Sequence, residues 1–107
     1  MIHLVPVSKR LPEIPAIRAL YREAFPPEEQ APFWLLMRKT TLPMTDFWAF
    51  YEQETWVGFA YVIQNETLAY LFYLAIAPEQ RGKGYGHQAM ACLKEQYASK
   101  TLFLSLE

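Results

Sequence analysis

The chain has 107 residues, of which 52% are hydrophobic and 20% are charged, and its formal net charge is −1. This length and composition indicate one small globular domain and exclude a disordered tail. The nearly balanced charge argues against nucleic acid as a partner. Every apolar run falls short of the ~20 residues that cross a membrane. The single cysteine, Cys92, excludes an intramolecular disulfide, and with no signal-peptide pattern we expect a cytoplasmic location.

The first third of the chain predicts a strand followed by two helices. Residues 2–7 alternate weakly and suit an edge strand, because Pro6 has no N–H group to donate. Apolar residues at helical spacing predict a helix within 11–25, which the prolines at 26–27 stop. A second helix is expected over 28–40.

The remainder predicts an antiparallel meander and then a crossover. Aromatic and β-branched residues favour three strands at 46–52, 56–63 and 68–76. The third is almost wholly apolar, so we expect it to be central and covered on both faces. A helix from Gly86 leads to a last strand, 101–107, which a right-handed crossover places parallel to 68–76. The result is an α+β domain of the three-layer α/β type, with a mixed sheet.

The stretch "RGKGYG" lies between the third meander strand and the following helix. Glycines at 82, 84 and 86 let the backbone approach a ligand and take positive φ. The first N–H groups of a helix lack partners and favour negative charge, and Arg81 and Lys83 add two cations. The pattern predicts a phosphate-binding loop. The alternative is a simple tight turn.

The sequence does not match the spacing of two common phosphate-binding motifs. A P-loop requires GxxxxGK[ST], which does not occur, and a dinucleotide site requires GxGxxG, whereas the spacing here is GxGxG. The meander also differs from the repeated βαβ units of a dinucleotide fold. A nucleotide-binding domain is therefore a third interpretation, which the spacing opposes.

Residues 81–86 resemble the R/Q-x-x-G-x-G/A signature of the GNAT superfamily of N-acetyltransferases. Residues 74–86, "LAIAPEQRGKGYG", are similar to that family's strand–loop–helix junction, and the predicted order matches its first eight elements. The resemblance implies a GNAT-like fold, with acetyl-CoA as the acetyl donor. The family's last helix and two strands have no counterpart here. We therefore expect residues 1–107 to be one acetyl-CoA-binding domain, the N-terminal part of a longer one. The other outcomes are an edge supplied by another chain, or loss of the half that completes catalysis.

The resemblance also implies which residues hold the cofactor. Backbone amides from Arg81 to His87 would bind the pyrophosphate, and the end of strand 68–76 would pair with pantetheine. The predicted set is Leu74, Ala75, Ile76, Arg81, Gly82, Lys83, Gly84, Tyr85, Gly86 and His87. Phe33 and Trp34 would form a wall of the acceptor site, because the second helix lines the acceptor cleft in the related family.

Catalysis has a weaker basis in the sequence. Attack by a neutral amine needs a base to take its proton and donors for the developing oxyanion. Glu107 and Tyr73 are the candidates, although Glu107 can equally be a solvated terminal residue. The family's general acid would lie beyond residue 107. His3, His87 and Cys92 have no metal-ligand spacing, so no metal is expected.

The sequence thus predicts an acetyl-CoA-dependent N-acetyltransferase, acting on a small-molecule amine or a peptide amine. The alternative is a CoA-binding or interaction module without turnover, because the glycine loop supports binding better than any residue supports chemistry. Strand 101–107 is apolar and would present an unpaired edge, so we also expect a homodimer formed through it.

Overall fold

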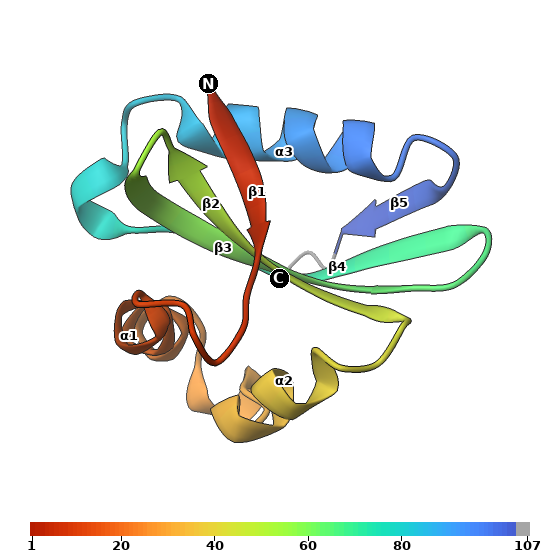
Figure 1. The fold of residues 1–107 in the computed structure, drawn as a ribbon, viewed down its shortest axis with the longest axis horizontal. Helices are drawn as coiled ribbons and strands as arrows, with labels where there is room; N and C mark the ends of the chain where they lie inside the picture. Colours follow the sequence, from red (N-terminus) through yellow and green to blue (C-terminus); the bar gives the residue numbers. More distant parts are fainter. Residues whose placement is uncertain (105–107) are drawn as a thin grey trace.

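The structure, a computed structural model, describes residues 1–104. Its elements are β1 (Ile2–Pro6), α1 (Ile14–Ala24), η1 (Pro27–Glu29), α2 (Phe33–Lys39), β2 (Thr45–Glu52), β3 (Thr55–Gln64), β4 (Leu68–Ile76), η2 (Pro78–Gln80), α3 (Tyr85–Gln96) and β5 (Thr101–Leu104). Helices α1 and α2 cover one face of the sheet and α3 covers the other (Figure 1). This confirms the predicted element order and the three-layer α+β fold. No helix within residues 1–104 is both long enough and apolar enough to cross a membrane.

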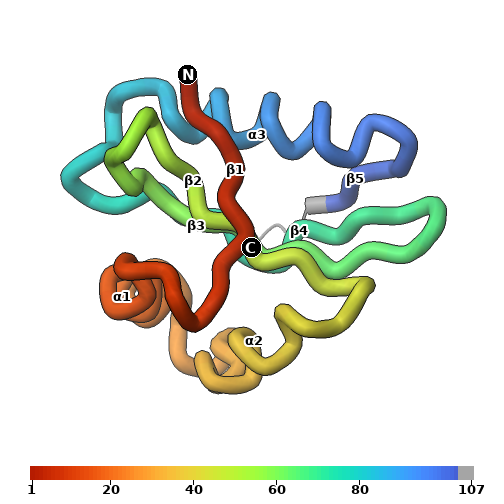
Figure 2. Tube along the Cα trace, in the orientation of Figure 1, coloured from red at the N-terminus to blue at the C-terminus, as the bar shows by residue number. Residues whose placement is uncertain are grey.

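The five strands form one mixed sheet in the order β1-β2-β3-β4-β5. Neighbouring strands are antiparallel except β4 and β5, which are parallel as the crossover rule requires. Strand β1 is an edge, in agreement with Pro6. Its first residues lie beside α3 (Figure 2), where the Ile2 N–H donates to the Gln88 side-chain oxygen at 3.0 Å.

Two expectations about the elements are wrong: the start of the second helix and the covering of β4 on both faces. The second helix begins at Phe33 instead of residue 28, and Pro27–Glu29 forms only a 3₁₀ turn. Pro32 explains the difference, because a proline drives the residue before it out of the helical region. Strand β4 is not covered on both faces: Leu68, Tyr70 and Phe72 are 38–43% exposed, since α1 lies over the other end of the strand and α2 lies over β2.

Two β-bulges decide which side chains face which helices. Val57 is the extra residue where β3 pairs with β2, and Phe72 is the extra residue where β4 pairs with β3. Before the β4 bulge, Leu71 packs on the α3 side; after it, Tyr73 packs on the side of α1 and α2. An extra residue reverses the alternation of a strand. The bulge therefore aims Tyr73 at the layer of α1.

The core consists of two apolar layers, one on each side of the sheet. Aromatic rings dominate the layer under α1 and α2, where Tyr21, Phe33, Phe47 and Phe59 are all nearly fully buried. The layer under α3 has more aliphatic residues, such as Val57, Val62 and Leu93, which pack with the rings of Phe50 and Tyr97.

The β3–β4 pair comes unusually close at Gly58. A Cβ atom at this position would lie 2.3 Å from the carbonyl oxygen of Ala75 and 3.1 Å from the Cα of Ile76. Real Cβ atoms do not approach backbone so closely, so only glycine allows this register. The position is also buried, which leaves no room for the strands to separate cheaply.

We predict that Gly58→Ala lowers the free energy of unfolding by about 2 kcal/mol or more, because the methyl group must push β4 away from β3. Gly86→Ala is the matched control: Gly86 lies in α3, and a Cβ there meets no atom within 4 Å. Alanine should leave the control unchanged or stabilise it by up to ~1 kcal/mol. Urea denaturation measures both. Equal stability of Gly58→Ala and the parent chain would contradict the close approach.

Candidate functional site

The glycine loop joins the end of β4 to the start of α3. After β4 the chain makes the η2 turn and then passes through two glycines with positive φ, Gly82 at 80° and Gly84 at 83°. Gly84 is the N-cap of α3 and adopts the left-handed conformation. Other residues pay roughly 1–2 kcal/mol for that conformation. The two glycines therefore shape the loop that the sequence singled out.

The space over this loop is open. A Cβ atom placed on Gly82, Gly84 or Gly86 would meet nothing within 4 Å. The first hydrogen bond of α3 runs from the Gln88 N–H to the Gly84 carbonyl oxygen at 3.2 Å. The N–H groups before it therefore precede the helical ladder and have no partner within the helix. This bare backbone at a helix N-terminus has the shape and polarity that suit a phosphate group.

The cations of the loop are held by exposed contacts. Arg81 donates from Nε to the Ile76 carbonyl oxygen at 3.0 Å, and its Nη2 lies 3.8 Å from Glu23 of α1. Lys83 donates to the Gln80 side chain at 3.1 Å. Exposed contacts of this kind contribute little free energy. A phosphate could therefore replace them.

The two other predicted members of the loop differ in their surroundings. Tyr85 is partly buried and packs against the core layer under α3. His87 is exposed on the first turn of the helix. The structure thus places the His87 side chain in solvent beside the loop, while the ring of Tyr85 helps to anchor α3.

Residues Leu74 to Ile76 offer one free backbone edge within residues 1–104. On one side they pair with β3, through Ala60, Phe59 and Gly58. On the other side the described pairing of β4 with β5 ends at Leu71, opposite Leu104. An extended ligand can bind such an edge through main-chain hydrogen bonds. Ile76 already accepts the bond from Arg81, which links the strand end to the glycine loop.

Tyr73 lies in an aromatic cluster between β4 and the segment that follows α1. Its hydroxyl donates to the Glu29 carbonyl oxygen at 2.7 Å. Its ring packs edge-on against Tyr21 and Phe25, with centroid distances of 5.0 and 4.8 Å. The Tyr21 hydroxyl donates to Ala31 at 2.8 Å, and burial, followed by the nearby Tyr73, raises the pKa of Tyr21 well above its usual value. Tyr73 therefore fastens the chain between α1 and α2 to the sheet, and Tyr21 fastens it to α1.

The other catalytic candidate, Glu107, lies outside the described residues. Glu28, a carboxylate in the segment between α1 and α2, is exposed on η1. Within the part of the chain that the structure describes, no three His, Cys, Asp or Glu side chains gather as a metal-ligand set.

Phe33 and Trp34, the predicted acceptor wall, lie on a cleft between α1 and α2, which we call the α1–α2 cleft. Its volume is about 870 Å³. Phe33 is buried in the core and also lines the cleft, whereas Trp34 is 62% exposed. No residue of β4, α3 or the loop between them lines this cleft. The structure therefore separates Phe33 and Trp34 from the predicted cofactor loop.

The sequence matches the model of the Acetyltransferase (GNAT) family over residues 14–106. This range covers both helices before the meander, the glycine loop and α3. The chain belongs to the GNAT acetyltransferase family. A comparison with curated proteins gives no match.

Solved structures show the same fold. A protein assigned to the GNAT family from Bacteroides thetaiotaomicron has a TM-score of 0.86 at 22% identity, over 98% of this chain. An acetyltransferase assigned to the family from Xanthomonas campestris pv. campestris has a TM-score of 0.71 at 21% identity, over the whole chain. An aminoglycoside 6'-N-acetyltransferase solved with coenzyme A has a TM-score of 0.72 at 22% identity, over 95% of the chain. The chain spans 60%, 76% and 60% of these proteins, respectively.

Sequence reasoning missed how the side chains around Tyr73 are used. The buried Tyr61 ring lies 6.1 Å from Tyr73, and its hydroxyl has no hydrogen-bond partner among the described residues. Helical spacing placed Tyr21 on the buried face of the first helix. Nothing in the sequence indicated that backbone carbonyls at Glu29 and Ala31 would accept from these phenols, because the turn between α1 and α2 decides where those carbonyls point.

We predict that Tyr73→Phe loosens the segment between α1 and α2, because the Glu29 carbonyl loses its donor. The free energy of unfolding should fall by about 1 kcal/mol. Amide hydrogen exchange at residues 28–31 should accelerate severalfold. Tyr70→Phe is the control, since Tyr70 lies on the same strand and is 38% exposed. Unchanged exchange in Tyr73→Phe would show that the hydroxyl does not hold this segment.

Proposed function

We propose that the protein is an acetyl-CoA-dependent N-acetyltransferase. The observation that carries this proposal is the open glycine loop at the N-terminus of α3, within a chain of the GNAT family. In this proposal the N–H groups from Arg81 to His87 bind the pyrophosphate. The free edge at Leu74, Ala75 and Ile76 binds the pantetheine arm. The coenzyme A complex of the aminoglycoside 6'-N-acetyltransferase supports the choice of cofactor.

The acceptor is proposed to be an amine, carried by a small molecule or a peptide. Several proteins with this fold are aminoglycoside acetyltransferases, and one was solved in complex with sisomicin at 15% identity to this chain. These likenesses support amine acetylation as the reaction class. Tyr73 and Glu107 remain the proposed catalytic residues, and Phe33 and Trp34 the proposed acceptor wall. We propose a cytoplasmic location.

The chemistry requires a neutral amine to attack the thioester carbonyl. A base takes the amine proton, donors stabilise the oxyanion, and the sulfur leaves as coenzyme A thiol after gaining a proton. The Tyr73 hydroxyl can accept a hydrogen bond while it donates to Glu29, so it can orient an amine. As a general acid it would first have to leave the Glu29 carbonyl.

A charged side chain introduced at position 84 tests the cofactor site. Asparagine and aspartate both tolerate positive φ better than other residues with side chains, and they have nearly the same shape. We predict that Gly84→Asp weakens acetyl-CoA binding at least tenfold relative to Gly84→Asn, because it places a negative charge against the pyrophosphate. Calorimetric titration of the folded variants measures this difference. Equal affinities, or a folded parent that does not bind acetyl-CoA, would refute the loop as the cofactor site.

Turnover distinguishes the enzyme from a CoA-binding module. Release of coenzyme A thiol in the presence of a panel of amines supports acetyl transfer. Tight binding without release from any amine supports the module.

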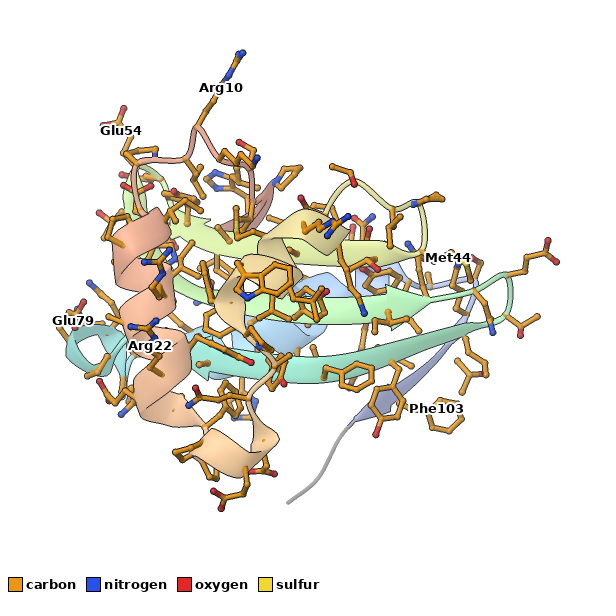
Figure 3. The ribbon with its side chains drawn as sticks, turned by 90° about the horizontal axis from the view of Figure 1, so that it is seen from below. Arg10, Arg22, Met44, Glu54, Glu79 and Phe103 are labelled. Carbon is orange, nitrogen blue, oxygen red and sulfur yellow. The ribbon has the colours of Figure 1, made fainter. Side chains whose placement is uncertain are left out.

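We also propose a homodimer formed through β5. Within residues 1–104 this strand pairs only with β4, and its Phe103 is 46% exposed (Figure 3). Unpaired strands with exposed apolar side chains favour pairing with another chain. Phe103→Lys should convert the dimer to a monomer in sedimentation velocity experiments. The matched change Leu42→Lys, at a residue 50% exposed between α2 and β2, should not. If the parent chain is a monomer at about 100 μM, the proposed dimer is refuted.

A further inference from the structure

We propose that the α1–α2 cleft binds a small anionic molecule with a flat apolar body. This inference concerns a ligand other than coenzyme A and does not rest on the proposed acetyl transfer. It is an alternative to the proposed acceptor wall, because Phe33 and Trp34 line this cleft and one cleft cannot favour both an amine and an anion. The cleft lies between α1 and α2, which stand side by side in front of the sheet in Figure 3. Its volume of about 870 Å³ falls in the range of small-molecule sites.

The charges that line the cleft all have one sign. Lys9 comes from the segment between β1 and α1, Arg18 from α1 and Arg38 from the last turn of α2. No Asp or Glu lines the cleft, and within residues 1–104 none of these cations has a carboxylate within 4.0 Å. The chain as a whole carries a net charge of −1, so the gathering does not follow from a basic composition. Three cations around a cleft focus a positive potential into it.

The apolar part of the cleft is flat and aromatic. Trp34 is 62% exposed, which is unusual for so large an apolar ring. Beside it, the Arg18 guanidinium carbon lies 5.3 Å from the centre of the Phe33 ring. This cation–π contact fixes Arg18 over the floor of the cleft without using its charge in an ion pair. Ile14 and Met37 complete the apolar lining. A planar ligand can stack on Trp34 while its anionic group faces Arg18.

Of the three hydroxyl groups at the cleft, that of Ser8 accepts from the Arg10 N–H and has a proton left to donate to an anion, whereas the threonine hydroxyls have none. Ser8 precedes α1, and Thr40 and Thr41 follow α2, at the same cleft. Both threonine hydroxyls donate to carbonyl oxygens one turn earlier, Thr40 to Met37 at 2.7 Å and Thr41 to Arg38 at 3.1 Å. The chemistry as a whole suits a carboxylate or phosphate on an aromatic body. It opposes a polycation, because three like charges would repel one.

The binding test compares two probes of similar size and opposite charge. 3-Phenylpropionate and 3-phenylpropylamine share a carbon skeleton, and one carries a carboxylate where the other carries an ammonium group. Titration of the parent chain, followed by NMR, should show the anion binding at least tenfold more tightly than the amine. Saturating acetyl-CoA should leave the affinity for the anion unchanged, because the cleft shares no residue with the glycine loop. No binding of the anion, equal binding of the amine, or competition with acetyl-CoA would overturn the proposal.

Two arginines on α1 provide a matched pair of variants. Arg18→Gln removes a cleft cation, whereas Arg22→Gln removes an exposed cation one turn later that does not line the cleft. We expect Arg18→Gln to weaken binding of 3-phenylpropionate about tenfold and Arg22→Gln to leave it within about twofold. Trp34→Ala should also weaken it, and Trp34→Phe should restore most of the affinity. Equal losses in the two arginine variants would indicate only a general charge effect and would overturn the site.

Discussion

The close pairing of β3 with β4 is the constraint on which the rest of the molecule depends. Gly58 lets the two strands approach until no side chain fits between them, which fixes their register. Together with the pairing of Val62 with Leu71, that register leaves Phe72 as the extra residue in β4. Beyond the bulge Tyr73 faces α1, and Leu74 to Ile76 pair with β3 up to the start of the glycine loop. Both parts of the candidate site therefore depend on how β3 pairs with β4.

Much of the fold could be predicted because its signals are local. The apolar stripe of α1, the turns of the meander and the glycines before α3 each occupy a short window of sequence. The start of α2 was missed because the prediction extended the helix back across Pro32, although its apolar residues begin only at Phe33. The exposed side of β4 was missed because an apolar strand does not reveal which neighbours are long enough to cover it.

The candidate site likewise has parts with a local signal in the sequence and parts without one. Gly82 and Gly84 have the positive φ values that their residue type suggested. The hydrogen bond from Tyr73 to Glu29 joins segments that are far apart in the chain. The same is true of the basic lining of the α1–α2 cleft. Lys9, Arg18 and Arg38 lie in three separate segments, and neither Arg10 nor Lys39, the cations next to two of them, lines the cleft. Only the packing of α1 against α2 brings them to one cleft.

The bulge at Phe72 is the one position in β4 at which the strand can lose a residue without turning its other side chains over. Without Phe72, Leu71 would still pair with Val62 and Tyr73 with Tyr61, so Leu71 would still face α3 and Tyr73 would still face α1. A regular strand that kept all nine residues would instead turn Tyr73 and Ala75 toward α3. Among natural homologues, a one-residue gap within β4 should therefore fall at the bulge, and other insertions and deletions should fall in the turns at the two ends of the strand.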